Sequence, residues 1–278
     1  MSGGGGLTCG GLPHFAATAT GHVDMWVVVA RYVAVWAAFF YAVVGVLKLL
    51  ERCGLALRPS AKAHENSVFF AAQCVACSTK SAIVSLMGLT AIWLHWNESA
   101  QNHFGGGDLA YTAGMIFGSF EVMDLCTCFL HNMLDAMLLV HHGVHISIGC
   151  IMMYNCGPHF STAILLAQDL SGSFLNPYLL FRHRHPNHPA LSALYAVFAL
   201  FFVALRLGLG SWGSYYYLSH YWEHLVEAEA RLFPAWQAHL LAVALVIGSA
   251  MQFGFFHTVA HHAHKMLRTP QAGPKKDE

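Results

Sequence analysis

Charged residues are scarce in this chain of 278 residues, at 10% of the sequence, whereas soluble domains carry about 25%. The 14 Lys and Arg residues are balanced by 14 Asp and Glu residues, so there is no basic excess of the kind that nucleic-acid phosphates select. The start of the chain lacks the basic segment and compact apolar segment of a cleavable signal peptide, and we interpret residues 1–20 as a flexible tail. These shortages argue against a soluble protein and against a nucleic-acid partner.

Long apolar runs take the place of the missing charge, because 56% of the residues are hydrophobic. A helix of about 20 apolar residues spans a bilayer and satisfies its own backbone hydrogen bonds there. The runs lie near residues 23–50, 68–96, 109–130, 133–155, 159–181, 189–211 and 235–263. The sequence therefore predicts an all-α, polytopic membrane protein with about seven transmembrane helices. The count depends on the short turn at 130–134, and six helices is the alternative.

Basic residues fall in every second loop of this arrangement, which predicts that those loops and the C-terminus are cytosolic. They are Lys48, Arg52, Arg58, Lys62, Arg182, Arg184, Lys265, Arg268, Lys275 and Lys276. The chain ends Lys275-Lys276-Asp277-Glu278, which resembles the dilysine retrieval signal of endoplasmic reticulum membrane proteins. The expected location is therefore the endoplasmic reticulum membrane.

Several ionisable residues lie inside the apolar runs, where each costs roughly 2.5 kcal/mol or more on insertion scales. They include Asp124, His141, His142, His145, Asp169 and Arg206. His141 and His145 are four positions apart and His142 and His145 three apart, so the three rings cover one broad helix face. We expect this face to line a polar cavity between the helices, near the cytosolic side. Arg206 falls near the outer end of the predicted span 189–211, and contact with lipid headgroups is an equal alternative for it.

Asp124 is followed after 16 residues by the pair His141-His142 and then by Asp169 within QDLSGSFLN. This order of the embedded acids and histidines resembles that of the TLC domain family, which includes the ceramide synthases. Ser171, Phe174 and Asn176 follow Asp169 at the offsets of the non-synthase branch, and Phe201-Phe202 with Arg206 resembles a later helix of that branch. The resemblance implies a TLC-type bundle over residues 65–265. Residues 21–64 would form a first helix with a basic cytosolic loop, and residues 266–278 a cytosolic tail.

This chain also departs from both branches of the family. Ceramide synthases carry a His-Asp-x-x-Asp stretch after the paired histidines, whereas residues 168–172 read QDLSG. The non-synthase branch has a histidine where Ser81 stands, a Thr-Pro where Gly172-Ser173 stands, and an arginine where Tyr178 stands. The sequence is therefore placed nearer the non-synthase branch.

The resemblance implies a protein that binds, senses or helps remodel an acyl-chain lipid in an intramembrane cavity. The expected catalytic or headgroup-polarising residues are His141, His142, Asp124 and Asp169, and the expected lipid-binding residues are His145, Ser171, Asn176 and Arg206. The partner is a membrane lipid, and no resident cofactor or metal is expected. The sequence leaves open which lipid is bound, whether any bond is made, and the oligomeric state.

Two other functions stay open. A ceramide-synthase-like N-acyltransferase would use a histidine of the pair as acyl acceptor or general base, with acyl-CoA as co-substrate. A membrane di-iron oxidase or hydroxylase would use histidine boxes. His257, His261 and His262 have that spacing. For His183, His185 and His188 we expect contact with lipid headgroups, and for Cys74 and Cys77 a packing role.

Overall fold

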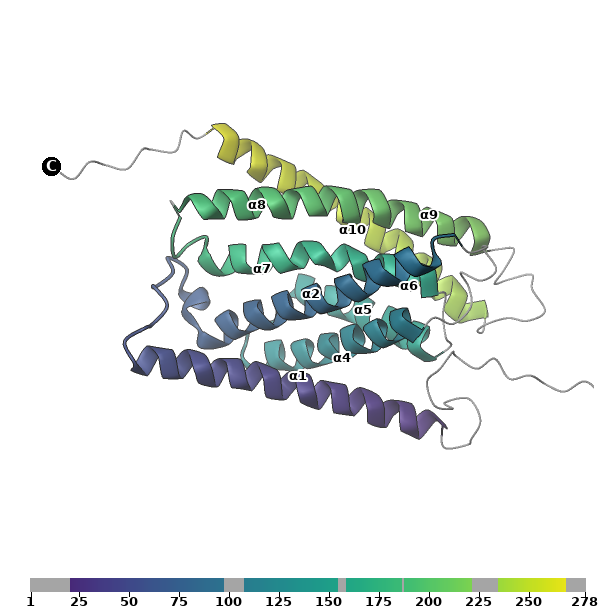
Figure 1. Ribbon diagram of the computed structural model, residues 1–278, viewed down its shortest axis with the longest axis horizontal. Helices are drawn as coiled ribbons and strands as arrows, with labels where there is room; N and C mark the ends of the chain where they lie inside the picture. The colour runs from purple at the N-terminus through teal and green to yellow at the C-terminus, as the bar shows by residue number, and fades with distance from the viewer. Residues whose placement is uncertain (1–20, 98–107, 155–158, 187, 222–234, 269–278) are drawn as a thin grey trace, which may run out of the picture.

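The computed structural model is a helical bundle and describes residues 21–97, 108–154, 159–186, 188–221 and 235–268, among which there is no strand. Most helices run along one common axis, and α10 crosses them obliquely (Figure 1). The elements are α1 (Gly21–Arg52), η1 (Ala63–Asn66), α2 (Val68–His95), α4 (Asp108–Leu130), α5 (Ala136–Tyr154), α6 (His159–Ala167), η2 (Gln168–Ser171), α7 (Gly172–Phe181), α8 (Pro189–Phe201), η3 (Phe202–Leu209), α9 (Gly210–Tyr221) and α10 (Ala235–Arg268). The predicted tail 1–20 and the lysine pair near the C-terminus lie outside the described residues.

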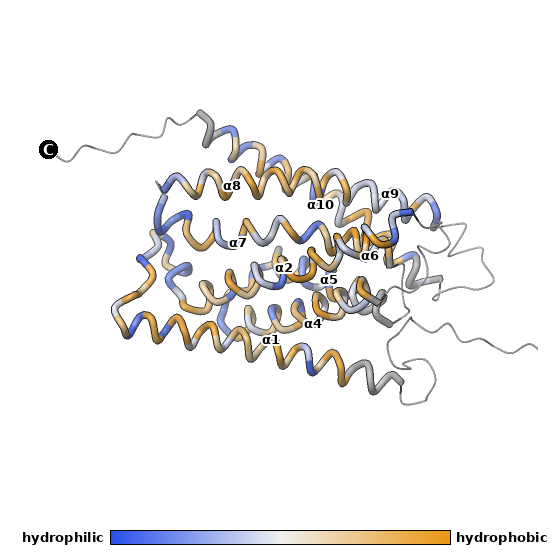
Figure 2. Tube along the Cα trace, viewed as in Figure 1, coloured by the Kyte–Doolittle hydropathy of each residue, from blue (hydrophilic) through white to orange (hydrophobic). Residues whose placement is uncertain are grey.

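Five helices of the described part are long and apolar enough to cross a membrane. They cover Val27–Arg52, Val68–His95, Leu109–Leu130, Pro189–His220 and His239–His264. Hydrophobic residues follow the helices, and hydrophilic residues gather at their ends (Figure 2). These helices match five of the seven predicted spans. The other two predicted spans fall on α5 and on the segment made of α6, η2 and α7.

Helix α2 lies at the centre of the bundle, packed against α1, α4, α6 and α7. It approaches α6 closely at Gly88, where a Cβ atom would come 2.7 Å from the carbonyl oxygen of Ala163 and 2.9 Å from the backbone nitrogen of Ala167. Small residues allow such approaches between helices in membranes. Ser81 lies two turns earlier on the same face of α2, so this packing turns Ser81 and its neighbour Lys80 into the bundle.

The predicted turn at 130–134 is confirmed. Helix α4 ends at Leu130, Asn132 takes a left-handed conformation with φ of 54°, and α5 begins at Ala136. The Asp135 carboxylate accepts a hydrogen bond of 2.7 Å from the backbone N–H of Leu138, which caps the new helix. The result is an α4–α5 hairpin, which brings the histidines of α5 beside the acidic residues of α4.

Two irregular segments interrupt the regular helices and pack against each other. The predicted span 159–181 contains the short 3-10 helix η2, and the helix that begins at Pro189 contains the π-helix η3. This second helix continues to Tyr221 and does not end near 211 as predicted. Arg206 therefore lies in the middle of a 32-residue apolar helix, and its predicted position near the outer end was wrong.

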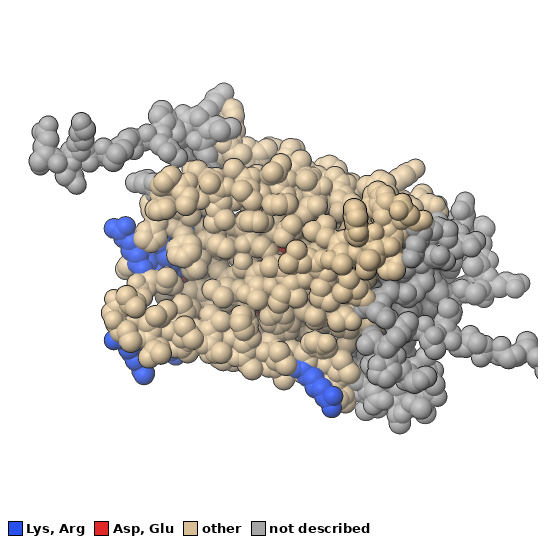
Figure 3. All heavy atoms as spheres, viewed as in Figure 1, with Lys and Arg blue, Asp and Glu red and all other residues tan. Residues whose placement is uncertain are grey.

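The basic residues gather at one end of the bundle. Figure 3 shows the Lys and Arg side chains of the visible face mostly at the end where α1 finishes, with a further one along α1. At this end Glu65 is completely buried. Its carboxylate accepts hydrogen bonds from Ser60 at 2.6 Å and His183 Nδ1 at 2.8 Å, and its backbone carbonyl accepts one from Arg184. His183 and Arg184 thus bind Glu65, which differs from the headgroup contact expected for this loop.

Replacing Glu65 by Gln is expected to flatten the pH dependence of stability at acid pH. Burial alone would raise the pKa of Glu65, but hydrogen bonds from Ser60 and His183 and the charges of His183 and Arg182 outweigh it and lower the pKa below the ordinary value of 4.5. A lowered carboxyl pKa stabilises the fold above pH 4.5, and this contribution is lost as the pH falls through the folded-state pKa.

The measurement is the melting temperature of the purified protein from about pH 7 to about pH 3, a range that includes the usual titration of carboxyl groups near pH 4. Glu51→Gln, at an exposed position near the end of α1, should leave the curve of the natural sequence unchanged. Parallel curves for the natural protein and Glu65→Gln would contradict the assigned role of Glu65.

Candidate functional site

A buried ion-pair centre joins three segments in the middle of the bundle. Lys80 of α2 is 5% exposed, and its Nζ lies 3.2 Å from Glu121 Oε1 of α4 and 2.8 Å from Asp169 Oδ2 of η2. Ser81 also donates a hydrogen bond of 2.8 Å to Asp169 Oδ2. The partner of Lys80 could not be assigned from sequence, and Glu121 was not among the predicted site residues.

Helix α5 connects to this centre through His142, which is 2% exposed. Its Nδ1 lies 2.7 Å from Glu121 Oε2, and its Nε2 lies 3.4 Å from Asp124 Oδ2. A carboxylate can only accept hydrogen bonds, so Nδ1 is the donor to Glu121. The predicted residues Asp124, His142 and Asp169 therefore belong to one network, with Glu121 and Lys80 as the links between them.

Arg206 enters the network from η3. Its Nη2 lies 3.6 Å from Asp169 Oδ1, and its Nε donates a hydrogen bond of 2.8 Å to Ser171 Oγ. A π-helical segment places side chains in directions that a regular α-helix does not offer, and such segments are frequent at functional sites. Arg206 thus faces into the protein. Of the two alternatives that the sequence left open, the structure favours the interior position over contact with the lipid headgroups at the membrane surface.

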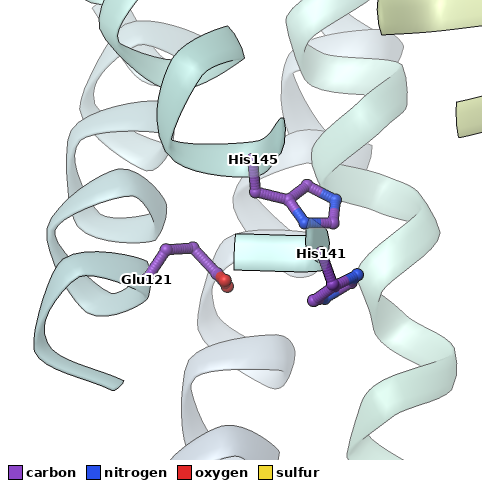
Figure 4. A group of neighbouring side chains, drawn as sticks. All are labelled: Glu121, His141 and His145. Atoms are coloured by element: carbon purple, nitrogen blue, oxygen red, sulfur yellow. The ribbon is translucent and has the colours of Figure 1, made fainter. Parts of the chain in front are cut away.

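His141 and His145 lie one turn apart on α5, with ring centroids separated by 4.1 Å. Figure 4 shows both rings and the Glu121 carboxylate facing a common space between the helices. Both histidines are partly exposed, whereas His142 is buried. His145 Nδ1 has no hydrogen-bond partner. The three histidines therefore divide into a buried ring held by carboxylates and two rings that are partly exposed.

Asn176 lies apart from this network. Its amide nitrogen donates a hydrogen bond of 2.8 Å to the carbonyl oxygen of Gly172 in its own helix. Its recorded contact is therefore local to α7, and its predicted role in lipid binding stays a prediction. Ser171, by contrast, links η2 to η3 through Arg206.

Metal-donor side chains come together twice within the described residues. Glu121, His141 and His145 form one group and Asp124, Cys128 and His142 the other, and in each the donor atoms lie within 4.8 Å of one another. Neither group includes a histidine of α10. His262 instead forms a 2.8 Å hydrogen bond with the hydroxyl of Tyr178, and His257 and His261 are exposed. Within the described residues, His257, His261 and His262, whose spacing suggested a di-iron site, are thus in neither group of metal donors.

A comparison with protein-family models gives a match to the TLC domain over residues 64–260. This match covers well over half of the chain. The chain belongs to the TLC domain family. The resemblance carried by Asp124, the paired histidines and Asp169 is thereby confirmed at the level of the family. A search of curated proteins gave no match.

Within this TLC domain, the departures from the family pattern have structural uses. Ser81, which stands where the non-synthase branch has a histidine, donates to Asp169. Ser173 and Ser78 of α2 exchange hydrogen bonds. Ser78 Oγ donates to the carbonyl oxygen of Ser173 at 2.9 Å, and Ser173 Oγ donates to the carbonyl oxygen of Ser78. The contact of Ser81 ties η2 of the TLC domain to α2, next to Lys80, and the contacts of Ser173 tie α7 to the same helix.

Glu121 is the residue of the TLC domain network that sequence reasoning missed. Its signal was available, because it lies in the same apolar run as Asp124, three positions earlier, and an acid at that depth normally has a partner. Both acids project from the same side of α4. A rule that paired each intramembrane acid with each intramembrane base would have proposed Lys80.

Proposed function

We propose that this TLC domain protein binds an acyl-chain lipid, with the lipid headgroup at His141 and His145. The supporting observation is the division of the network into a closed part and an open part. Lys80, Glu121 and His142 are buried, whereas His141 and His145 are partly exposed and the side chains of Arg206 and Asp169 are 19% and 15% exposed. An amphiphile needs a few polar groups for its headgroup beside apolar surface for its chain.

The ring nitrogens and the guanidinium of Arg206 offer hydrogen-bond donors to a headgroup oxygen, and Asp169 offers an acceptor. The buried ion pairs hold these groups in place, because His141 and His145 share a helix with His142, and Arg206 is paired with Asp169. A site of this kind would serve binding, sensing or remodelling of the lipid. The proposal includes seven membrane crossings, with α5 and the α6–α7 segment as the additional two.

The proposed location is the endoplasmic reticulum membrane, with the C-terminus cytosolic. The lysine pair at 275–276 and the basic residues gathered at one end of the bundle (Figure 3) support this orientation. Microscopy of the tagged chain against compartment markers tests the location. A steady-state distribution confined to the plasma membrane would contradict it.

Photoactivatable, clickable lipids tested in native membranes address the binding proposal. The variant His141→Ala/His145→Ala should lose about thirtyfold in cross-linking, since two hydrogen bonds of about 1 kcal/mol each are removed. His264→Ala, which changes an exposed histidine of α10, serves as the matched control and should label like the natural protein. Equal labelling of all three would reject the site. Acyl-CoA-dependent N-acylation of a long-chain base by the purified protein would instead favour the acyltransferase alternative.

A further inference from the structure

Three buried donor side chains lie on the inner side of the α4–α5 hairpin. Asp124 and Cys128 are one turn apart on α4, and His142 comes from α5. They are 3%, 0% and 2% exposed, and one donor atom of each lies within 4.8 Å of the others. The two neighbouring helices therefore direct an oxygen, a sulfur and a nitrogen atom at one point that is closed to solvent.

The tautomer of His142 places two hydrogen-bond acceptors, its own Nε2 and Oδ2 of Asp124, opposite each other at this point. Because Nδ1 donates to Glu121, Nε2 of the neutral ring carries a lone pair directed toward Asp124 Oδ2, 3.4 Å away. Nε2 is buried and has no hydrogen-bond partner. Two buried acceptors that face each other are unfavourable, and either a proton or a metal cation between them removes the conflict.

The donor set selects the kind of cation. Imidazole nitrogen, thiolate sulfur and carboxylate oxygen are the ligands of zinc, and a ligating histidine usually donates its other ring N–H to a carboxylate. Glu121 occupies that supporting position, at 2.7 Å from His142 Nδ1. The Gln73 side chain donates to Cys128 Sγ at 2.9 Å and to Asp124 Oδ1 at 3.3 Å, which orients the other two donors. The arrangement thus has ligands and their supporting contacts.

Charge balance is compatible with a divalent ion at the same point. The described network contains the carboxylates of Glu121, Asp124 and Asp169 against the cations of Lys80 and Arg206. A bound ion would hold Cys128 as a thiolate, so that four negative charges face two positive ones. A divalent cation bound by neutral His142 makes the buried network neutral, and burial of unbalanced charge is costly.

The alternative group of Glu121, His141 and His145 in Figure 4 is less suited to a metal ion. Both carboxylate oxygens of Glu121 already have partners, Lys80 at 3.2 Å and His142 at 2.7 Å. The ammonium group of Lys80 would repel a cation placed there.

We propose that Asp124, Cys128 and His142 bind a zinc ion that fastens α4 to α5. Cys77 lies next to this group, with its Sγ 3.9 Å from Asp124 Oδ2. This site is separate from the proposed lipid site at His141 and His145. It also departs from the expectation, made from sequence, that the chain has no metal site.

The test measures zinc by elemental mass spectrometry in the full chain, purified in detergent and dialysed against micromolar zinc. The natural protein should hold about one zinc ion per chain, and Cys128→Ser and His142→Ala should hold at least tenfold less, on the order of the loss of a ligand bond. Cys126→Ser is the matched control, because Cys126 is exposed on the same helix, and it should retain the zinc.

The absorption spectrum of the cobalt-loaded natural protein tests the site without relying on the stability of a variant. The natural protein loaded with cobalt(II) should show a sulfur-to-cobalt charge-transfer band and the visible absorption of a tetrahedral site, and folded Cys128→Ser should lack the band. Natural protein without bound zinc or the cobalt band would overturn the proposal, as would equimolar zinc in folded Cys128→Ser. These readings do not involve lipid, so failure of lipid cross-linking leaves them unaffected.

Discussion

Replacing Lys80 by Met should lower the free energy of unfolding by about 3–5 kcal/mol, the usual cost of removing one partner of a buried ion pair. Met keeps the length of the aliphatic stem, so the packing loss is small. Glu121 and Asp169 would both lose the ammonium group that lies 3.2 Å and 2.8 Å from them. The ring of Phe117, 4.6 Å from Nζ, would lose its cation as well.

Thermal unfolding of the purified chain measures this effect through a thiol-reactive dye, because Cys74 and Cys128 are buried in the folded state and become reactive on unfolding. The melting temperature should fall by about 10 °C. Lys62→Met, at an exposed position before α2, is the matched control and should melt like the natural protein. Equal melting of both variants would show that the ion pair of Lys80 is absent in solution.

Replacing Asp169 by Asn should have an effect of similar size, about 3–5 kcal/mol, from the opposite side of the same centre. Asp169 is the acidic partner of both Lys80, at 2.8 Å, and Arg206, at 3.6 Å. The amide of Asn occupies the same volume and still accepts the hydrogen bond of Ser81, so the change removes charge and little else. It leaves the cations of Lys80 and Arg206 without the carboxylate that contacts both of them.

Asp135→Asn is the control for this substitution. Asp135 is exposed and caps α5, a position where Asn performs as well as Asp, so the melting temperature should stay unchanged. If the Asp169→Asn variant has the same melting temperature as this control, the charge of Asp169 has no role in stability.

The double variant Lys80→Met/Asp169→Asn links the two predictions. Removing both charges leaves neither partner of this ion pair buried without the other, so the combined loss should be smaller than the sum of the single losses, with a coupling of about 0.5–3 kcal/mol. Strict additivity would mean that the two side chains do not interact directly.

Much of the fold could be predicted because its causes are local. The length and apolarity of the runs determine helices that cross a membrane, and five of the seven predicted runs are confirmed as such helices. The short turn after Leu130 was predictable because Asn132 and Asp135 favour turns and helix caps. The membership in the TLC family was also predictable, since the resemblance rests on residue types and spacings that can be read along the chain.

Only some of the residues of the site could be predicted from the sequence, and their contacts with one another could not. Asp124, His142 and Asp169 were found because an ionisable side chain at bilayer depth needs a partner or a function. The partner of each was not predictable. Lys80 lies 41 positions from Glu121 and 89 from Asp169, and α2 is apolar on nearly every face, so no amphipathic pattern shows which side turns inward.

The sequence by itself determined that this protein consists of membrane-crossing helices, that its basic residues lie toward one end, and that acids and histidines are embedded between them. These follow from transfer free energies that each residue contributes independently. Only the tertiary structure decided that Arg206 faces Asp169 and that His142 lies between two carboxylates. It also decided that Arg184 donates a hydrogen bond to the backbone carbonyl of Glu65. The physical reason is that helix rotation and crossing are fixed by close packing, as at Gly88 against α6, and by the π-helical turn at Arg206, which involve residues far apart in the chain.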